Sequence, residues 1–187
     1  MNDQLERKIV HLPLSHEDAR ALRAGELLYL RGTIYTARDA AHKRMIEAVA
    51  KGESLPFDPS NLAIYYAGPC PAKPGTVIGS AGPTTSGRMD AYAPTLISLG
   101  QTVMLGKGLR KPEVLEAMKT YGAVYMGATG GAGAFLSKRI TSCEVIAYPD
   151  LGAEAIRKLE VFDFPCVVLI DCEGNSLYDR SDDARLG

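Results

Sequence analysis

The chain has 187 residues, which suffices for one domain with a sizeable core and makes a second full domain unexpected. Its 21 Lys and Arg nearly cancel its 22 Asp and Glu, so the net charge of -1 argues against broad attraction to nucleic acid or to an anionic membrane. The apolar runs are far shorter than the roughly twenty residues that cross a bilayer, and the charged N-terminus lacks a secretory signal. A soluble, cytoplasmic protein is therefore expected.

Apolar strand-like runs alternate with helical patterns along the chain, and this alternation predicts a single α/β domain over residues 1–178. The charged tail, 179–187, is expected to fray. Strands are expected at 9–14, 27–30, 33–36, 62–66, 76–79, 102–105, 124–126, 143–147 and 166–171. Helices are expected from the Ser15 cap to Gly25 and at 37–50, 89–99, 112–121, 134–139 and 153–159.

The four cysteines contain no C-x-x-C pair, so no metal site is expected in this chain. The glycine-rich run 127–133 lacks the Lys-Ser/Thr of a P-loop and does not match a dinucleotide-binding fingerprint. We interpret it as close packing, with approach to a ligand or partner as the alternative.

The first candidate cluster lies at the start of the helix predicted over 37–50, where Arg38, Asp39 and His42 can share one face. A carboxylate beside an imidazole fixes its tautomer and raises its basicity, which suits a proton carrier. The alternative is an exposed first turn with ordinary ion pairs, in which Asp39 is stabilised by the positive helix end. The spacing alone favours this alternative.

The second candidate is the loop 82–90, which presents hydroxyls at Thr84 and Thr85 and a guanidinium at Arg88 within a few residues. Its glycines let the backbone approach a ligand closely, and amides at the start of the following helix favour an anion. A Pro-containing turn with a Ser or Thr cap is an equally weighted alternative.

The third candidate is Lys107, which has glycine on either side and follows the strand predicted at 102–105. Ligands of open α/β sheets collect outside such strand ends, although a solvated lysine in a turn is commoner. Together, Arg38, Arg88 and Lys107 provide three cations on separate loops, which suit a small dicarboxylate. No metal ligands, nucleophile with its base, or cofactor loop accompany them, so the sequence indicates half of an active site.

At these residues the chain resembles the beta subunit, or C-terminal domain, of the iron–sulfur (class I) fumarases and L-tartrate dehydratases. The resemblance covers nearly the whole chain and rests on four ordered motifs: Gly32-Thr33 with 37–42, then 82–89, 106–108 and 150–155. It implies a swivelling β/β/α domain that pairs with a separate alpha subunit, in an assembly such as α2β2. The cysteines of that alpha subunit would hold a [4Fe-4S] cluster, and none would be bound by this chain.

The resemblance further implies a hydro-lyase of the tricarboxylic acid cycle, which converts malate reversibly to fumarate plus water and is active only with its alpha subunit. By position, Arg38, Arg88 and Lys107 match carboxylate clamps, and Thr85 belongs to the same binding loop. Thr84 matches a proposed base, although a threonine hydroxyl is a poor one, and His42 with Asp39 matches a position regarded as catalytic in tartrate dehydratases. Both proton carriers stay open.

Two other functions remain as alternatives. One is an L-tartrate dehydratase beta subunit, although Ser86-Gly87-Arg88 and the residues after Lys107 look more like fumarase. The other is a non-catalytic dicarboxylate-binding or regulatory module, in which the three cations bind an effector and His42 is structural.

Overall fold

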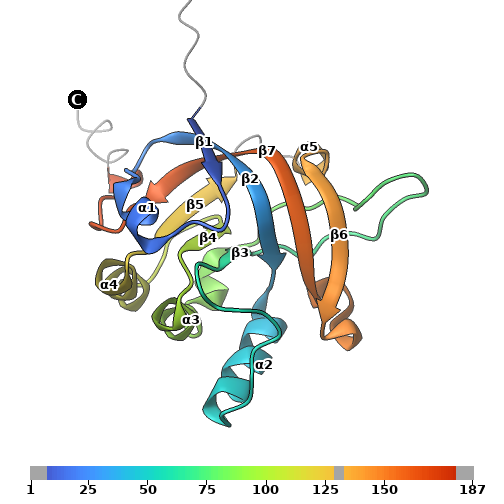
Figure 1. Ribbon diagram of the computed structural model, residues 1–187, viewed down its shortest axis with the longest axis horizontal. Coiled ribbons are helices and arrows are strands. Elements are labelled where there is room, and N and C mark those ends of the chain that lie inside the picture. The colour runs from blue at the N-terminus through green and yellow to red at the C-terminus, as the bar shows by residue number, and fades with distance from the viewer. Residues whose placement is uncertain (1–7, 129–132, 180–187) are drawn as a thin grey trace, which may run out of the picture.

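The computed structural model describes residues 8–128 and 133–179, and it confirms a mixed α/β fold (Figure 1). One sheet of seven strands runs in the order β1-β2-β3-β4-β5-β7-β6. The strands are β1 Lys8–His11, β2 Leu27–Thr36, β3 Ala63–Tyr65, β4 Val103–Gly106, β5 Val124–Ala128, β6 Ile140–Ala147 and β7 Ile156–Ile170. The α-helices are α1 His16–Ala21, α2 Asp39–Ala50, α3 Ala93–Leu99, α4 Pro112–Tyr121 and α5 Gly133–Ser137, and the 3-10 helices are η1 Ser86–Met89 and η2 Pro149–Glu154.

The sheet closes on itself because β7 bonds to strands on both flanks. β2, β3, β4 and β5 are parallel neighbours in that order. β7 runs antiparallel to β5 and also to β2, so the hydrogen bonds return to the first strand of the series. β1 and β6 extend this ring at β2 and β7.

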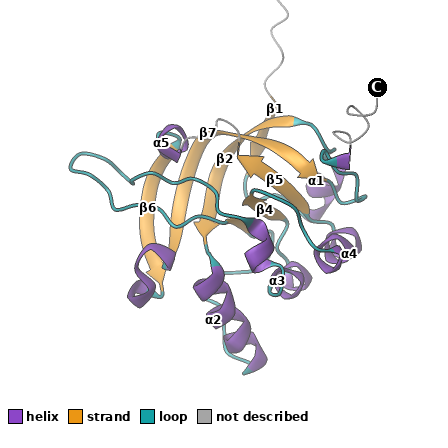
Figure 2. Ribbon diagram, turned by 180° about the vertical axis from the view of Figure 1, so that it is seen from behind, coloured by secondary structure: helices purple, strands orange, loops and turns teal. Residues whose placement is uncertain are grey.

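Alternating side chains divide the buried residues into two clusters, as expected for strands covered on both faces. On β4, Val103 and Leu105 belong to a cluster built from the strands of the ring, whereas Met104 belongs to a second cluster shared with α2, α3 and α4. These three helices lie together along one side of the ring (Figures 1 and 2). The described helices are all too short or too polar to cross a membrane.

Several elements begin or end at the residues that local sequence signals predicted. Ser15 caps α1 by accepting a hydrogen bond from the Asp18 amide. Pro112 begins α4 at a position where its missing N–H costs nothing, and Gly122 ends this helix in the left-handed conformation. The predicted bounds of α4 are therefore confirmed.

Three predictions of secondary structure were wrong. The helix expected over 153–159 is the end of η2 followed by β7, because β7 forms ladders with β2 and β6 that local propensity does not reveal. The helix expected over 89–99 is split into η1 and α3, since Pro94 cannot continue a helix from residue 90. The segment 76–79 is irregular and belongs to a long loop between β3 and η1, which projects from the body (Figure 2).

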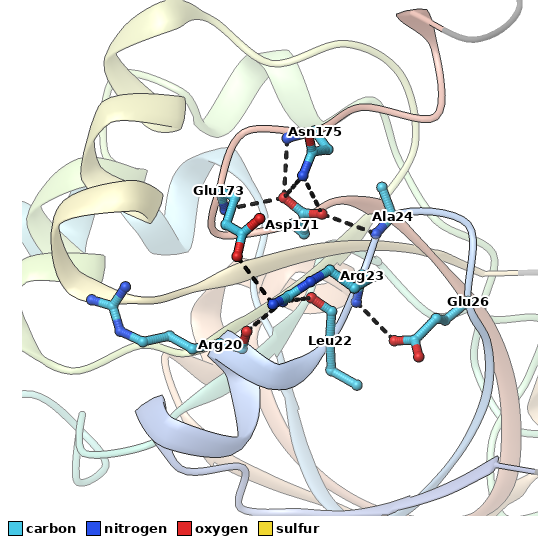
Figure 3. Close-up of polar contacts among 8 residues, drawn as sticks. All are labelled: Arg20, Leu22, Arg23, Ala24, Glu26, Asp171, Glu173 and Asn175. Carbon is cyan, nitrogen blue, oxygen red and sulfur yellow. Dashed lines mark hydrogen bonds and ion pairs between the residues drawn. The ribbon is translucent and has the colours of Figure 1, made fainter.

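The buried carboxylate of Asp171 joins the segment that follows β7 to the segment that precedes β2 (Figure 3). Asp171, which follows β7, accepts hydrogen bonds from the amides of Ala24, Glu173 and Asn175 and from the Asn175 side chain. Arg23 pairs with Glu173 across the same junction. The turn at 173–175 is thus held against the segment that precedes β2. The tail from 180 and residues 129–132 of the glycine-rich run lie outside the described residues.

Candidate functional site

The predicted site residues lie beyond the carboxyl ends of three parallel strands. Arg38 and Asp39 follow β2, Lys107 follows β4, and the Thr84 amide donates a 2.7 Å hydrogen bond to the carbonyl of Tyr66, the residue after β3. Neighbouring parallel strands end at the same edge of a sheet, so these segments meet there although they are far apart in sequence. The prediction that strand ends carry the site is consistent with this placement.

Asp39 lies between two of the predicted cations. Its Oδ1 is 3.9 Å from Nε of Arg38, and its Oδ2 is 3.9 Å from Nη1 of Arg88. The side chain of Arg88 is 58 % exposed and that of Arg38 is 26 % exposed. Two guanidinium groups from different elements therefore approach one carboxylate, and both remain accessible at the surface.

Lys107 joins the same site through the backbone of the hydroxyl-bearing loop. Thr85 and Lys107 form a parallel bridge, and the Ser86 amide donates to the Lys107 carbonyl at 2.9 Å. Thr84 is half-buried, whereas Thr85 and Lys107 are exposed. The backbone of Lys107 thus lies beside the loop 84–88.

A buried ion pair supports these two loops from below. Arg110 Nε and Asp90 Oδ1 are 2.7 Å apart, with side chains 0 % and 1 % exposed. Asp90 also accepts a 2.7 Å hydrogen bond from the Lys111 amide, and the Arg110 guanidinium lies over the rings of Tyr66 and Tyr125. Sequence reasoning missed this pair. The available signal was the opposite charge of Asp90, which ends the loop 82–90, and Arg110, which lies two residues after the Gly-Lys-Gly motif.

The small size of Gly106 and Ser86 lets the two loops approach each other. A Cβ at Gly106 would overlap the Ser86 hydroxyl and lie 2.9 Å from the Tyr66 ring. The Tyr125 hydroxyl lies 2.9 Å from Ser86 Oγ and 2.8 Å from the Gly108 carbonyl. This network fixes the backbone on either side of Lys107.

The expected pairing of His42 with Asp39 is not the hydrogen bond that forms. His42 is fully buried, and its Nδ1 lies 2.9 Å from the carbonyl of Arg38, which fixes the proton of the neutral ring on Nδ1. Burial lowers the pKa of His42 to about 4, opposed by this hydrogen bond, and Asp39 acts as a more distant charge. Its Nε2 is buried without a hydrogen-bond partner in the described part of the chain. His42 therefore holds the backbone of Arg38 and is less basic than predicted.

Glu154 is a second residue that sequence reasoning did not assign to the site. Its Oε1 lies 3.6 Å from Nε of Arg38, and η2, which carries it, packs against α2. Glu154 lies in the motif 150–155 on which the resemblance rests, but that motif does not link it to Arg38, which is 116 positions away. The helix predicted over 153–159, which includes Glu154, was also wrong.

The described residues do not form a metal centre. Among them, no group of three or more His, Cys, Asp or Glu side chains is arranged to hold a metal ion. Cys166 and Cys172 are buried, whereas Cys70 is exposed on the long loop. These thiols do not fit the requirement of an iron–sulfur cluster for several converging cysteines.

Comparison with known proteins identifies relatives over most of the chain. The model of the family described as "Fumarase C-terminus" matches residues 2–181. The aerobic class I fumarate hydratase of Salmonella typhimurium is 43 % identical over 162 residues, which are 86 % of this chain and 28 % of that protein. That of Escherichia coli is 44 % identical over 155 residues, 82 % of this chain and again 28 % of the relative. A Methanocaldococcus jannaschii protein with the provisional name L(+)-tartrate dehydratase subunit beta is 41 % identical over 89 % of both chains.

Proposed function

The chain belongs to the fumarase C-terminus family, and from this premise we propose that it supplies the substrate-carboxylate clamps of a hydro-lyase. The proposed reaction is the reversible dehydration of malate to fumarate. The chain spans 28 % of the fumarate hydratases that it matches, so the complete reaction needs residues of the remaining part as well.

The observation that carries this proposal is that Arg38 and Arg88 both approach Asp39, while the backbone of Lys107 forms a bridge with the loop that carries Arg88. Three accessible cations on separate rigid supports match the two carboxylates of a small dianion. Removal of a proton beside a carboxylate builds further negative charge on that group, and fixed cations stabilise such a transition state more than the substrate. We therefore assign Arg38, Arg88 and Lys107 as clamps, with Thr85 in the binding loop.

Thr84 and His42 remain the candidates for the proton carrier. His42 has an unprotonated Nε2 in the neutral ring, but its low pKa makes it a weak base and its burial separates it from solvent. Thr84 is half-buried in the loop that carries Arg88. Nearby cations favour an alkoxide over a hydroxyl, and this physical effect supports Thr84 as the carrier with His42 and Asp39 as positioning groups.

The proposal includes a cluster-bearing alpha subunit, which is what the resemblance to the iron–sulfur fumarases implies. That subunit would hold the [4Fe-4S] group, and the two chains would form a cytoplasmic assembly such as α2β2 in which this chain is the swivelling domain. The 89 % coverage of a protein named as a beta subunit supports this arrangement.

The second candidate function is the dehydration of L-tartrate, which the name of the Methanocaldococcus jannaschii relative favours. The same clamps would bind tartrate, since it is also a 2-hydroxydicarboxylate. A non-catalytic dicarboxylate-binding module is the third candidate.

Assembly of the chain with a cluster-bearing alpha subunit under anaerobic conditions separates these functions. Rates are measured with malate, tartrate and citramalate, and with the purified chain alone as the control. We expect the highest kcat/KM with malate and no turnover by the chain alone. A preference for tartrate would select the second candidate, and binding without turnover would select the third. Robust turnover by the iron-free chain would contradict the proposal.

A further inference from the structure

Arg38 has a second acidic neighbour besides Asp39. Its Nε lies 3.6 Å from Glu154 Oε1 and 3.9 Å from Asp39 Oδ1, so carboxylates from two different elements approach the guanidinium at one atom. Arg38 Nε, Asp39 Oδ1 and Glu154 Oε1 are all buried and have no hydrogen-bond partner in the described part of the chain. Buried charged atoms that face one another without hydrogen bonds are uncommon, and they point to a functional arrangement.

The Arg38 side chain is confined on the side of the long loop as well. A Cβ at Gly68 would lie 3.0 Å from Nη1 and 3.1 Å from Cδ of Arg38, and 3.3 Å from the Ala153 carbonyl. Arg38 therefore passes between the start of the long loop and η2. Because the two carboxylates approach Nε, the Nη groups are left for a ligand carboxylate.

The segment that carries Glu154 is anchored by contacts that do not involve the Glu154 side chain. Arg44 on α2 forms two hydrogen bonds of 2.8 and 2.7 Å with the Asp150 carboxylate. The Arg157 guanidinium donates to the carbonyls of Gly152, Ala153 and Ala155, each at 3.1 Å. These bonds fix η2 at both ends, so the Glu154 carboxylate does not need its ion pair for folding.

We propose that Glu154 is a positioning residue for Arg38: its carboxylate holds the Nε side of the guanidinium and thereby aims the Nη groups at the substrate carboxylate. This inference rests on the proposed function of Arg38 as a clamp. Asp39 is shared between Arg38 and Arg88, whereas the ion pair of Glu154 is with Arg38, so Glu154 is the carboxylate that can hold Arg38 independently of Arg88.

A double-mutant cycle in the assembled enzyme tests the coupling. We expect Glu154→Gln to lower kcat/KM for malate about tenfold, Glu154→Asp to recover part of that loss, and the exposed control Glu116→Gln to have no effect. In an Arg38→Ala background, Glu154→Gln should cause no further loss, because a residue that acts through Arg38 cannot act without it. The proposal would be overturned if the fold-losses in kcat/KM of the two single variants multiplied in the double variant. An unchanged kcat/KM for Glu154→Gln would also overturn it.

A second readout does not depend on activity and so separates this inference from the proposed function. In the purified full chain, the ¹H–¹⁵N resonance of Arg38 Nε is identified as the one that disappears in the Arg38→Lys variant. We expect Glu154→Gln to shift this resonance and Glu116→Gln to leave it in place, with the melting temperature unchanged in both. A shifted resonance in an enzyme that does not turn over malate would support the pairing and refute the proposed function. An unshifted resonance, or a loss of folding in both Glu154→Gln and Glu154→Asp, would refute the positioning role.

Discussion

Arg110 and Asp90 form a fully buried ion pair beneath the candidate site, with 2.7 Å between Nε and Oδ1. The pair connects the end of η1, which carries Arg88, to the segment that carries Lys107. Two clamps on separate loops therefore share one support.

Loss of Arg110 should destabilise the protein because it leaves Asp90 buried without its cation. We expect Arg110→Met to reduce the free energy of unfolding by about 3–5 kcal/mol, as measured by urea denaturation. The matched control is Arg139→Met, whose guanidinium lies over the ring of the exposed Phe135. A loss below about 1 kcal/mol for Arg110→Met would show that the pair is not a major support.

The burial of His42 should make stability depend on pH. The folded protein binds a proton at His42 near pH 4, whereas the unfolded chain binds it near pH 6.5, so the unfolded state takes up more protons between these values. The free energy of unfolding should then fall by about 3 kcal/mol as the pH drops from 6.5 to 4.

Comparison with His42→Asn isolates this contribution. The free energy of unfolding of the unaltered protein, relative to that of His42→Asn, should increase as the pH rises over the same window. A His42 imidazole that titrates near pH 6.5 in ¹⁵N spectra of the folded protein would contradict the assignment.

A side chain at position 106 should separate the two site loops. We expect Gly106→Ala to cost about 2 kcal/mol of stability, since its Cβ would overlap the Ser86 hydroxyl in a packed region. Gly87→Ala is the control, because the nearest atom to its Cβ is a carbonyl oxygen at 3.9 Å. Equal thermal denaturation midpoints for the two variants would contradict the packing argument.

The ionised Asp171 carboxylate should stabilise the folded protein at neutral pH and lose this effect in acid. Burial raises its pKa, but the hydrogen bonds from Asn175, Ala24 and Glu173 lower it by more, so the net pKa lies below its ordinary value. Its contribution is therefore present above about pH 4 and lost as the pH falls further. We expect Asp171→Ala to cost about 3 kcal/mol at pH 7 in urea denaturation. A cost that is unchanged at pH 2 would contradict the role of the charge.

The sequence predicted best those features that depend on neighbours in the chain. Pro112 and Gly122 mark both ends of α4, and Ser15 with Asp18 marks the start of α1. The loop carrying Arg88 was found because its hydroxyls, glycines and cation occur together in the sequence. These signals are local and need no knowledge of the fold.

Features that depend on distant segments were missed. Residues 156–159 were predicted as helix, but they pair with β2 and β6 on their two sides. Glu154 meets Arg38 because α2 and η2 pack together, and Asp90 meets Arg110 because two loops converge. The spacing of Asp39 and His42 suggested a pair, but a full helical turn also brings His42 to the carbonyl of Arg38, and burial selected that partner.

The most direct test of the central claim is the effect of Arg88→Ala on malate dehydration by the chain assembled with its cluster-bearing alpha subunit. Lys119→Ala, which removes a cation from α4, is the charge-matched control. If Arg88 binds a substrate carboxylate as charge develops on it, kcat/KM should fall by roughly two orders of magnitude or more, while the control stays within about twofold. Equal kcat/KM values for Arg88→Ala and the unaltered enzyme would contradict the claim that these cations clamp the substrate.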